Sequence, residues 1–589
     1  MNSAAAEIDV HDRLIREAFI EPIRTVVVVD DDYPTLDTLS AKELGNTHGW
    51  SDKKSENIPR VRNLFSFARN RERPWIIDIH DANGAGSLQS GRQAASHLHE
   101  SDLLILDYHL QGDSGGGDAA ISILRDLALG GYFNLVIVHT KGNSGDHLSV
   151  LREIALALTS PIQLLSAVEM GSANSMLDEW EELDDGVVSR LREEVSTDCY
   201  LELRGHKAFN ISAFLQRPEG QRVLEIWKKR PVGIKIDSKL LANWLLHMKQ
   251  EQIQKQLSSI DLGNVQVGRK EGINWILADK LFVTVLPKTC EPDEFEAKLL
   301  DAIRASFPSP HRLLLAKMRA EIDKQGLSAE AAILGNRYLQ AEWLGDFLNP
   351  NPTDATAVVY STVSRHWEAL GDQLHQSVGD FTKQLHDHFS TLEVGEVMAR
   401  CGLNKNDIGS PEALRRFNCY ASTKPFDRGH LTTGHVFKFQ PPEEDAQYWI
   451  CLSPACDMVP RQEKIDGNLP FIAVRLHRFT DERPIKNAAK NVFLFIDIEG
   501  EIQTFSIHKD GVGENPDWQQ MLVRSGGRFS EGNCLKLCSV IDTGEELKLE
   551  LFEGNVVAQL RSEYALNLLQ RIGTVLSRPG LGMNFKQRS

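Results

Sequence analysis

The first part of the chain alternates short apolar runs with segments of helical spacing. Apolar runs at Thr25–Asp32, 74–82, 103–107 and Asn134–Thr140 each have the length of one buried strand. Amphipathic segments lie between them at 60–70, 90–100 and 118–131, while the polar stretch 33–60 indicates an irregular insertion. Strands that alternate with helices predict a parallel sheet with helices on both faces.

The alternation stops after Lys141 and resumes more than a hundred residues later. Residues 146–273 are mostly polar with helical spacing, which predicts a helical insertion. Residues 274–288 then indicate a strand, and 291–307 place Phe295, Leu299, Ile303 and Phe307 on one helical stripe. We expect this strand and helix (274–308) to complete a five-stranded parallel sheet whose first four strands lie within 21–145.

The remaining segments predict helices at the start and in the middle of the chain and strands at its end. Residues 1–20 indicate an amino-terminal helix, and 309–424 a helical connector. From 425 to 589 the period shifts toward two, with strand-like runs separated by turn residues and one last helix at 562–576. This pattern is typical of a small β-barrel or sandwich.

Length, charge and cysteine content narrow the class of protein. A chain of 589 residues is long enough for several domains. Its net charge of -17 disfavours nucleic acid as a partner, because phosphates would be repelled. The beginning of the chain lacks the apolar core of a signal peptide, no run is long enough to span a bilayer, and the eight cysteines are dispersed. We therefore expect a cytoplasmic protein without a membrane partner.

Charged and hydroxyl side chains follow the predicted strands. Asp30 and Asp31 end the first strand, Asp107 the third, Thr140 the fourth and Lys288 the fifth. Ligands of open parallel sheets gather at the carboxyl ends of the strands. Converging carboxylates repel one another unless a hard cation such as Mg²⁺ lies between them. A carboxylate can also accept a phosphoryl group, with Lys288 as the balancing ammonium and the Thr140 hydroxyl as a hydrogen-bond donor.

The sequences TVVVVDDD, LLILDYHLQGDSGGGDAA and NLVIVHT resemble the receiver domain of bacterial two-component response regulators. The resemblance covers about a quarter of the chain. It implies a flavodoxin-like fold in which Asp107 is the phospho-acceptor. It also implies that Asp30, Asp31, Asp107 and the main-chain carbonyl of His109 bind Mg²⁺, and that Thr140 and Lys288 complete the catalytic set.

Several features depart from that family. An insertion follows the acid pair, Pro287 precedes the lysine instead of a proline following it, and Val285 replaces an aromatic residue. In these respects the chain resembles the divergent receivers of bacterial anti-phage conflict systems. The resemblance implies two versions of the input. Either a histidine kinase phosphorylates Asp107, or a protein of a defence system docks on a receiver that has lost phosphorylation.

The carboxy-terminal module has candidate chemistry of its own. YWICLSPACDM places Ser453, Cys456 and Asp457 after two strands, and His430, His435 and His477 are possible bases for a cysteine nucleophile. Free cysteine is usually buried, so we expect Cys456 to be a core residue. The module resembles, weakly, SH3-like barrels of RNA-cleaving toxins. An output module under receiver control is the leading hypothesis, with an RNA-cleaving effector or a structural adaptor as the alternatives.

Overall fold

The computed structural model divides the chain into two compact units. Unit 1 consists of residues 1–321 and 377–402, and unit 2 of residues 322–376 and 403–589. The structure describes residues 10–46, 49–80, 101–112, 116–204, 209–348, 355–426, 429–441, 445–459, 467–480, 485, 492–511, 516–542, 544 and 546–577. Expected features at 1–9, 90–100, 349–354 and 578–589 lie outside these residues.

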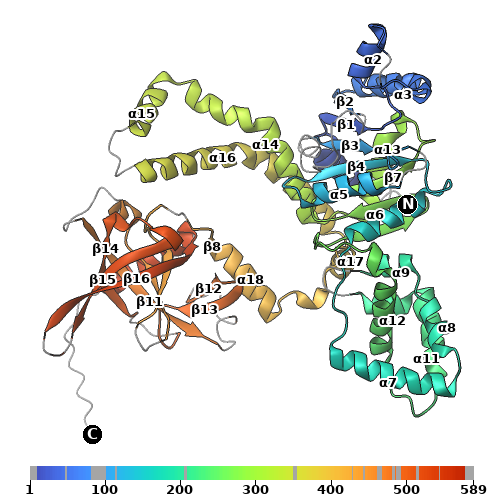
Figure 1. The fold of residues 1–589 in the computed structure, drawn as a ribbon. Coiled ribbons are helices and arrows are strands. Elements are labelled where there is room, and N and C mark those ends of the chain that lie inside the picture. Colours follow the sequence, from blue (N-terminus) through green and yellow to red (C-terminus); the bar gives the residue numbers. More distant parts are fainter. Residues whose placement is uncertain are drawn as a thin grey trace. The chain divides into compact units, whose positions relative to one another are not determined.

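Unit 1 is built around a seven-stranded sheet with the order β2-β1-β3-β4-β7-β6-β5 (Figure 1). Its first five strands in this order are mutually parallel, which is the flavodoxin-like order. The strands are β1 (Thr25–Val29), β2 (Ile76–His80), β3 (Leu103–Leu106), β4 (Asn134–Thr140), β5 (Gln266–Lys270), β6 (Ile273–Leu277) and β7 (Leu281–Pro287).

The two faces of this sheet belong to different apolar clusters. Leu104 and Leu106 of β3 pack in a cluster with α5, α6 and the helices of the insertion. Leu103 and Ile105 pack on the other face, with α3, α13 and the amino-terminal helical residues. Every residue of β3 and β4 is buried, because side chains alternate between two covered faces. Continuous apolar runs therefore formed the clearest strand signals in the sequence.

The prediction of five parallel strands was incomplete. Residues 266–270, expected in the helical insertion, form β5, and the segment expected as one strand forms β6 and β7. β5 and β6 pair antiparallel around Glu271 and Gly272, which both have positive φ. Two residues with positive φ make the tight turn that suits a twisted hairpin, and the resulting sheet is mixed rather than parallel.

Several helices of unit 1 begin at residues whose side chains cap them. Asp146 accepts a hydrogen bond at the start of α6, and Asp237 does so at the start of α12. The stretch 33–60, expected to be irregular, contains α2 and the first half of α3, with Thr35 and Ser51 as their caps. The helices are η1 (Arg16–Ile20), α2 (Leu36–Glu43), α3 (Asp52–Arg69), α5 (Asp118–Leu129), α6 (His147–Leu158), α7 (Ala167–Leu183), α8 (Val187–Glu193), α9 (Thr197–Leu203), α10 (Ile211–Gln216), α11 (Pro218–Lys228), α12 (Ser238–Ile253), α13 (Phe295–Ser306) and α17 (Val394–Arg400).

Three further helices lie between α13 and the carboxy-terminal module. They are α14 (Pro310–Leu334), α15 (Arg337–Phe347) and α16 (Ala355–Phe389), and α14 and α16 each contribute residues to both units. The end of α16 supplies Phe381, Leu385 and Phe389 to a core cluster of unit 1. Among the helices that the structure describes, none is both long enough and apolar enough to cross a membrane.

The rest of unit 2 contains a closed β-barrel. Its strands follow the order β10-β9-β16-β15-β14-β11, and β11 pairs back with β10, so that six antiparallel strands form a ring. The barrel strands are β9 (His435–Phe439), β10 (Gln447–Cys451), β11 (Asn468–Phe479), β14 (Trp518–Arg524), β15 (Cys534–Asp542) and β16 (Leu547–Leu560). The sequence signal of β14 is weak, because Gln519 and Gln520 interrupt its apolar pattern. Closure removes free edges from these strands.

Smaller elements complete this module. The hairpin of β12 (Phe493–Ile498) and β13 (Glu501–Ser506) pairs with the end of β11, and β8 (Thr423–Lys424) pairs with β16. The helices are α18 (Pro411–Ser422) and α20 (Ser562–Leu576), and the second of these matches the predicted last helix. Phe437, Phe471 and Met521 lie in one apolar cluster of the barrel, and α20 packs in a second cluster with β12 and β13.

Candidate functional site

The carboxyl ends of four neighbouring strands place the predicted residues at one edge of the sheet. Asp30 follows β1, Asp107 follows β3, Thr140 ends β4 and Lys288 follows β7. The main chain continues the ladder at these points, because Asp107 N–H donates to the Val29 carbonyl and Lys288 N–H to the Thr140 carbonyl, both at 2.8 Å. Asp30, Asp107 and Thr140 are all buried. The site thus lies where ligands of such sheets bind.

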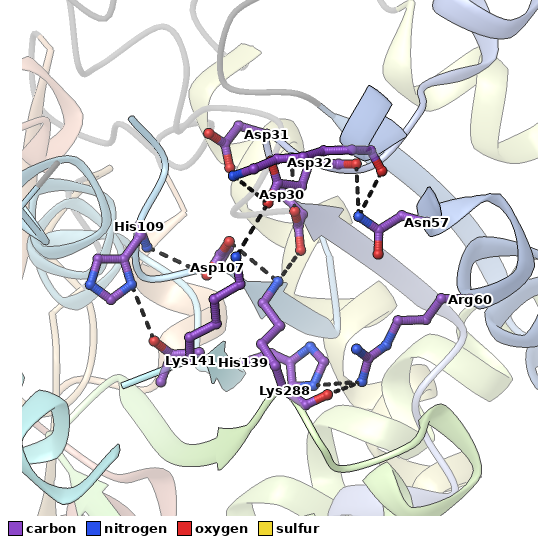
Figure 2. A network of polar contacts seen from close by, with 12 residues as sticks. Asp30, Asp31, Asp32, Asn57, Arg60, Asp107, His109, His139, Lys141 and Lys288 are labelled. Atoms are coloured by element: carbon purple, nitrogen blue, oxygen red, sulfur yellow. Dashed lines mark hydrogen bonds and ion pairs between the residues drawn. The ribbon is translucent and has the colours of Figure 1, made fainter. Parts of the chain in front are cut away.

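Lys288 balances the charge of two carboxylates (Figure 2). Its Nζ forms an ion pair with Asp30 and lies 3.2 Å from Asp107 Oδ2. Burial, together with the nearby Asp107, raises the pKa of Asp30 to about 6 although Lys288 opposes the shift. Burial would lower the pKa of Lys288, but the two carboxylates outweigh it and raise the pKa. The ring of Tyr33 faces the ammonium at 5.3 Å. These contacts make a compact group of two acids and one base.

Asp30, Asp31 and Asp32 bring carboxylate oxygens together. Each offers one oxygen, and these atoms lie within 4.8 Å of one another. Asp31 accepts a hydrogen bond of 3.0 Å from the Gly112 N–H, and Gly112 adopts a positive φ that favours glycine. Burial raises the pKa of Asp31, and Asp32 and Asp107 raise it further. Clustered carboxylates of this kind suit a hard divalent cation.

The acidic cluster differs in membership from the predicted set. Asp32 belongs to it, although the sequence analysis did not assign Asp32 a role. The sequence did indicate this residue, as the third of three consecutive acids after the first strand. The Asp32 carboxylate lies 3.3 Å from Lys53 Nζ and 3.8 Å from Lys141 Nζ. Asp107 and Asp30 both form ion pairs with the ammonium of Lys288, which lies between them. The oxygen-only donor set fits Mg²⁺ in its chemistry.

His109 and Thr140 lie beside Asp107. The His109 N–H donates to Asp107 Oδ1 at 3.4 Å, and its ring Nδ1 lies 3.4 Å from the Thr140 hydroxyl. The same hydroxyl oxygen accepts a hydrogen bond of 3.0 Å from the Gly142 N–H. The hydroxyl is therefore held beside the acidic group, within a hydrogen-bonded path from β4 to the loop after β3.

Helix α3 supplies three side chains that the sequence analysis did not find. Lys53 pairs with Asp32, and Asn57 Nδ2 donates to the Asp32 carbonyl at 3.3 Å. Arg60 Nη2 donates to the Lys288 carbonyl and lies 3.4 Å from His139 Nε2. Burial lowers the pKa of His139 well below its usual value, and Lys288 and Arg60 lower it further. No local pattern signals these contacts, because they join residues far apart in the chain.

Comparison with known families gives one match. Residues 22–188 match the family model of the response receiver domain. This part of the chain is a receiver domain. The match ends within α8, so β7 and Lys288 belong to the receiver sheet by their position in the structure and not by the comparison. Searches of the curated proteins and of the solved structures found no significant match for the chain.

The receiver domain thus has its acids at the carboxyl ends of β1 and β3. The order of its five parallel strands agrees with a receiver domain, and Asp30, Asp31 and Asp107 follow β1 and β3 at one edge of the sheet. Its departures are the α2–α3 segment after the acids and the long helical insertion between β4 and β7. Neither segment interrupts the pairing of the five parallel strands.

The candidate cluster of the barrel module has a different character from the receiver pocket. Cys456 is exposed, which contradicts the prediction of a core cysteine, and its thiol lies 3.7 Å from Asp457 Oδ1. Ser453 is buried, and its hydroxyl accepts a hydrogen bond from the Ile472 N–H. His435 is fully buried and His477 pairs with Asp517. Within the described residues, the structure places no histidine in hydrogen-bond contact with Cys456.

Proposed function

We propose that the protein is a response-regulator-like signalling protein that is switched at Asp107. The receiver domain carries the input, and the six-stranded barrel module serves as the output or partner-binding part. The observation that supports this proposal best is the position of Asp107, buried at the end of β3 with the Lys288 ammonium 3.2 Å from its carboxylate. A carboxylate that is held beside a cation and other acids suits phosphoryl transfer.

The chemistry requires few groups. An Asp107 carboxylate oxygen attacks the phosphorus of a phosphodonor, and the bond from phosphorus to the donor's nitrogen or oxygen breaks. The donor leaves with the bonding electron pair, as acetate when acetyl phosphate is the donor or as imidazole when a phosphohistidine is the donor. Lys288 then faces the added negative charge, and the Thr140 hydroxyl can donate to a phosphoryl oxygen.

We infer that Asp30, Asp31, Asp107 and the carbonyl of His109 bind Mg²⁺, and Asp32 is a further candidate from the acidic cluster. Such an ion, when bound, neutralises charge on the carboxylates and on the phosphoryl oxygens. The oxygens of residues 30, 31 and 32 fit this role in type and in proximity. The close approach of several acids, with burial opposing their ionisation, supports an ion as part of the resting site.

The partner that we propose is a histidine kinase, which phosphorylates Asp107, or a protein of a bacterial defence system. A second version of the same proposal needs no phosphorylation, because a partner can dock on the acidic face of the receiver domain. The net charge of -17 supports a protein partner over nucleic acid. The two versions differ in one measurable property, the modification of Asp107.

Incubation with acetyl phosphate and Mg²⁺, followed by mass spectrometry of the intact protein, tests the proposal. We expect one phosphoryl adduct that survives acid and is lost in alkali, and none in Asp107→Asn. Asp118→Asn is a matched control, because Asp118 is an exposed acid at the start of α5, and it should be modified like the wild type. A wild-type protein that stays unmodified with small phosphodonors would retire the phosphorylation version and leave docking.

A further inference from the structure

Arg60 connects helix α3 to the loop that carries Lys288. Its Nη2 donates to the main-chain carbonyl of Lys288 and, at 2.8 Å, to that of Cys290. The same nitrogen lies 3.4 Å from Nε2 of the buried His139. One guanidinium therefore binds both sides of a three-residue loop and contacts the strand next to it (Figure 2).

Main-chain hydrogen bonds and the buried His139 also contact this loop. Lys288 N–H donates to the Thr140 carbonyl, and Cys290 N–H donates to the Pro287 carbonyl at 2.9 Å, which closes a tight turn. Thr289 at the tip is exposed. A proline ring would fix the φ angle at this position, and threonine has no such ring. The carbonyls of Lys288 and Cys290 point toward α3 and are bound by Arg60. Charge-assisted hydrogen bonds of this kind are stronger than neutral ones.

The contacts of Arg60 continue along one face of α3. Lys53, Asn57 and Arg60 are spaced by four and three residues, which places them on one side of the helix. Lys53 and Asn57 hold Asp32, at the end of β1, and Arg60 holds the loop after β7. Helix α3 thus contacts the segment that carries Asp30 as well as the loop that carries Lys288.

We propose that Arg60 is a positioning residue for Lys288. By fixing the carbonyls on both sides of Thr289, it holds the main chain of Lys288 so that the ammonium lies between Asp30 and Asp107. Arg60 does not touch the reacting carboxylate itself. The effect of Arg60 on the position of Lys288 does not depend on phosphorylation, whereas any effect on phosphotransfer rests on the function proposed above.

Removal of Arg60 should loosen the ammonium without removing its charge. In Arg60→Met the side chain keeps much of its length but donates no hydrogen bond, so the turn loses the two hydrogen bonds that tie it to α3. The ion pair of Lys288 with Asp30 and Asp107 then opens more often. We expect the open fraction to rise roughly tenfold, the factor that corresponds to the loss of one charge-assisted hydrogen bond.

Competitive labelling of lysines tests this inference directly. The full-length protein is treated with trace amine-reactive reagent, and labelling at Lys288 is measured by peptide mass spectrometry relative to the exposed Lys270. Arg60→Met should raise the relative labelling of Lys288 roughly tenfold. Arg62→Met should leave it unchanged, because Arg62 is exposed on the same helix. Equal labelling of Lys288 in Arg60→Met and the wild type, with the fold retained, would overturn the inference.

A second pair of variants separates positioning from general loosening of α3. Val61→Ala removes buried apolar contacts of the helix and leaves Arg60 in place, so labelling of Lys288 should stay near the wild-type value. Arg60→Lys keeps the charge, but its side chain is shorter and ends in an ammonium instead of a planar guanidinium, so its labelling should fall between those of the wild type and Arg60→Met. If Val61→Ala raises the labelling as much as Arg60→Met, Arg60 has no special role. Arg60→Lys also serves if the methionine variant does not fold.

The phosphorylation assay distinguishes this inference from the proposed function. With acetyl phosphate as the probe, Arg60→Met should lower the maximal rate of modification and leave the donor concentration at half-maximal rate unchanged. A wild-type protein without any adduct would remove the proposed phosphorylation, and the labelling result would still decide the role of Arg60. A modified wild type with unchanged Lys288 labelling in Arg60→Met would keep the function and reject the positioning role.

Discussion

Lys288 is the residue on which the charge balance of the receiver pocket depends. It is the cation that Asp30 and Asp107 share, and all three side chains are largely withdrawn from solvent. Removal of one partner from a buried ion pair leaves a charge without compensation. We predict that Lys288→Met costs about 3 kcal/mol of unfolding free energy, measured in urea without divalent ions.

Mg²⁺ should recover part of this loss. An ion that binds only the folded state stabilises it, and it should do so more strongly when the carboxylates have lost their ammonium. Lys141→Met is the control, because Lys141 is more than half exposed and 3.8 Å from Asp32, and it should change stability little. An equal response to Mg²⁺ in Lys288→Met and the wild type would show that the acids do not share a site with the ion.

His11 allows a prediction of pH dependence away from the pocket. Its ring stacks on His388 at 5.3 Å and contacts Phe307 and Phe389. Burial lowers its pKa from 6.5 to about 4, and His388, Arg400 and Arg304 oppose its protonation while Asp12 favours it. Between pH 6.5 and about pH 4, the His11 ring is therefore protonated in the unfolded chain and neutral in the folded chain.

The sign of the effect follows from this difference. Stability is complete above pH 6.5 and is lost as the pH falls toward 4, by at most about 3 kcal/mol. We predict that His11→Phe shows a smaller decrease of the unfolding free energy over this range, measured by urea denaturation at several pH values. A decrease as steep as that of the wild type would assign the acid sensitivity to other groups.

The parts of the site that the sequence indicates are those that follow buried strands. Asp30, Asp107 and Lys288 each come directly after an apolar run, and parallel pairing places the ends of such runs side by side. Arg60 and His139 gave no comparable signal. Arg60 binds carbonyls 228 and 230 residues away, and main-chain acceptors leave no mark in the sequence.

At the scale of elements, the same distinction separates predicted strands from missed ones. β3 and β4 are buried on both faces and appear as continuous apolar runs, so their positions could be predicted. β5 is a partly exposed edge strand with Gly268 at its centre, and its composition resembles a polar loop. The helix pair in the stretch 33–60 was hidden by low apolar content, since α2 has no buried residue.

The β5–β6 hairpin depends on the absence of a side chain at Gly268. A Cβ there would lie 2.4 Å from Cε2 of Trp275, its partner across the hairpin. We predict that Gly268→Ala displaces the indole and costs about 1 to 3 kcal/mol, the usual range for overpacking. Gly171→Ala is the control in α7, where nothing lies within 4 Å, and it should be neutral or stabilising. Equal stability of the two variants in urea would contradict the described packing.

At the scale of the whole molecule, each unit has its own apolar core. The members of the three barrel clusters lie between residues 419 and 572, while those of the two receiver clusters lie in residues 10–316 and 381–389. Separate cores favour separate unfolding, because a cooperative transition follows from shared buried contacts. A receiver domain that acts as a switch must keep its own fold, and so must the module that it controls. The two must also remain connected.

Calorimetry tests both properties in one experiment. We predict two thermal transitions for the full chain, and the isolated fragment 403–577 should keep the transition of the barrel at nearly the same temperature. Beryllofluoride with Mg²⁺, a mimic of the phosphoryl group, should raise the receiver transition in the wild type and in Asp118→Asn but not in Asp107→Asn, because only binding at the acidic pocket stabilises that unit. A fragment that does not fold, or one transition for the whole chain, would show that the barrel depends on the receiver for stability. The receiver domain would then control the barrel module because the two fold together, and not through a contact that the switch makes or breaks.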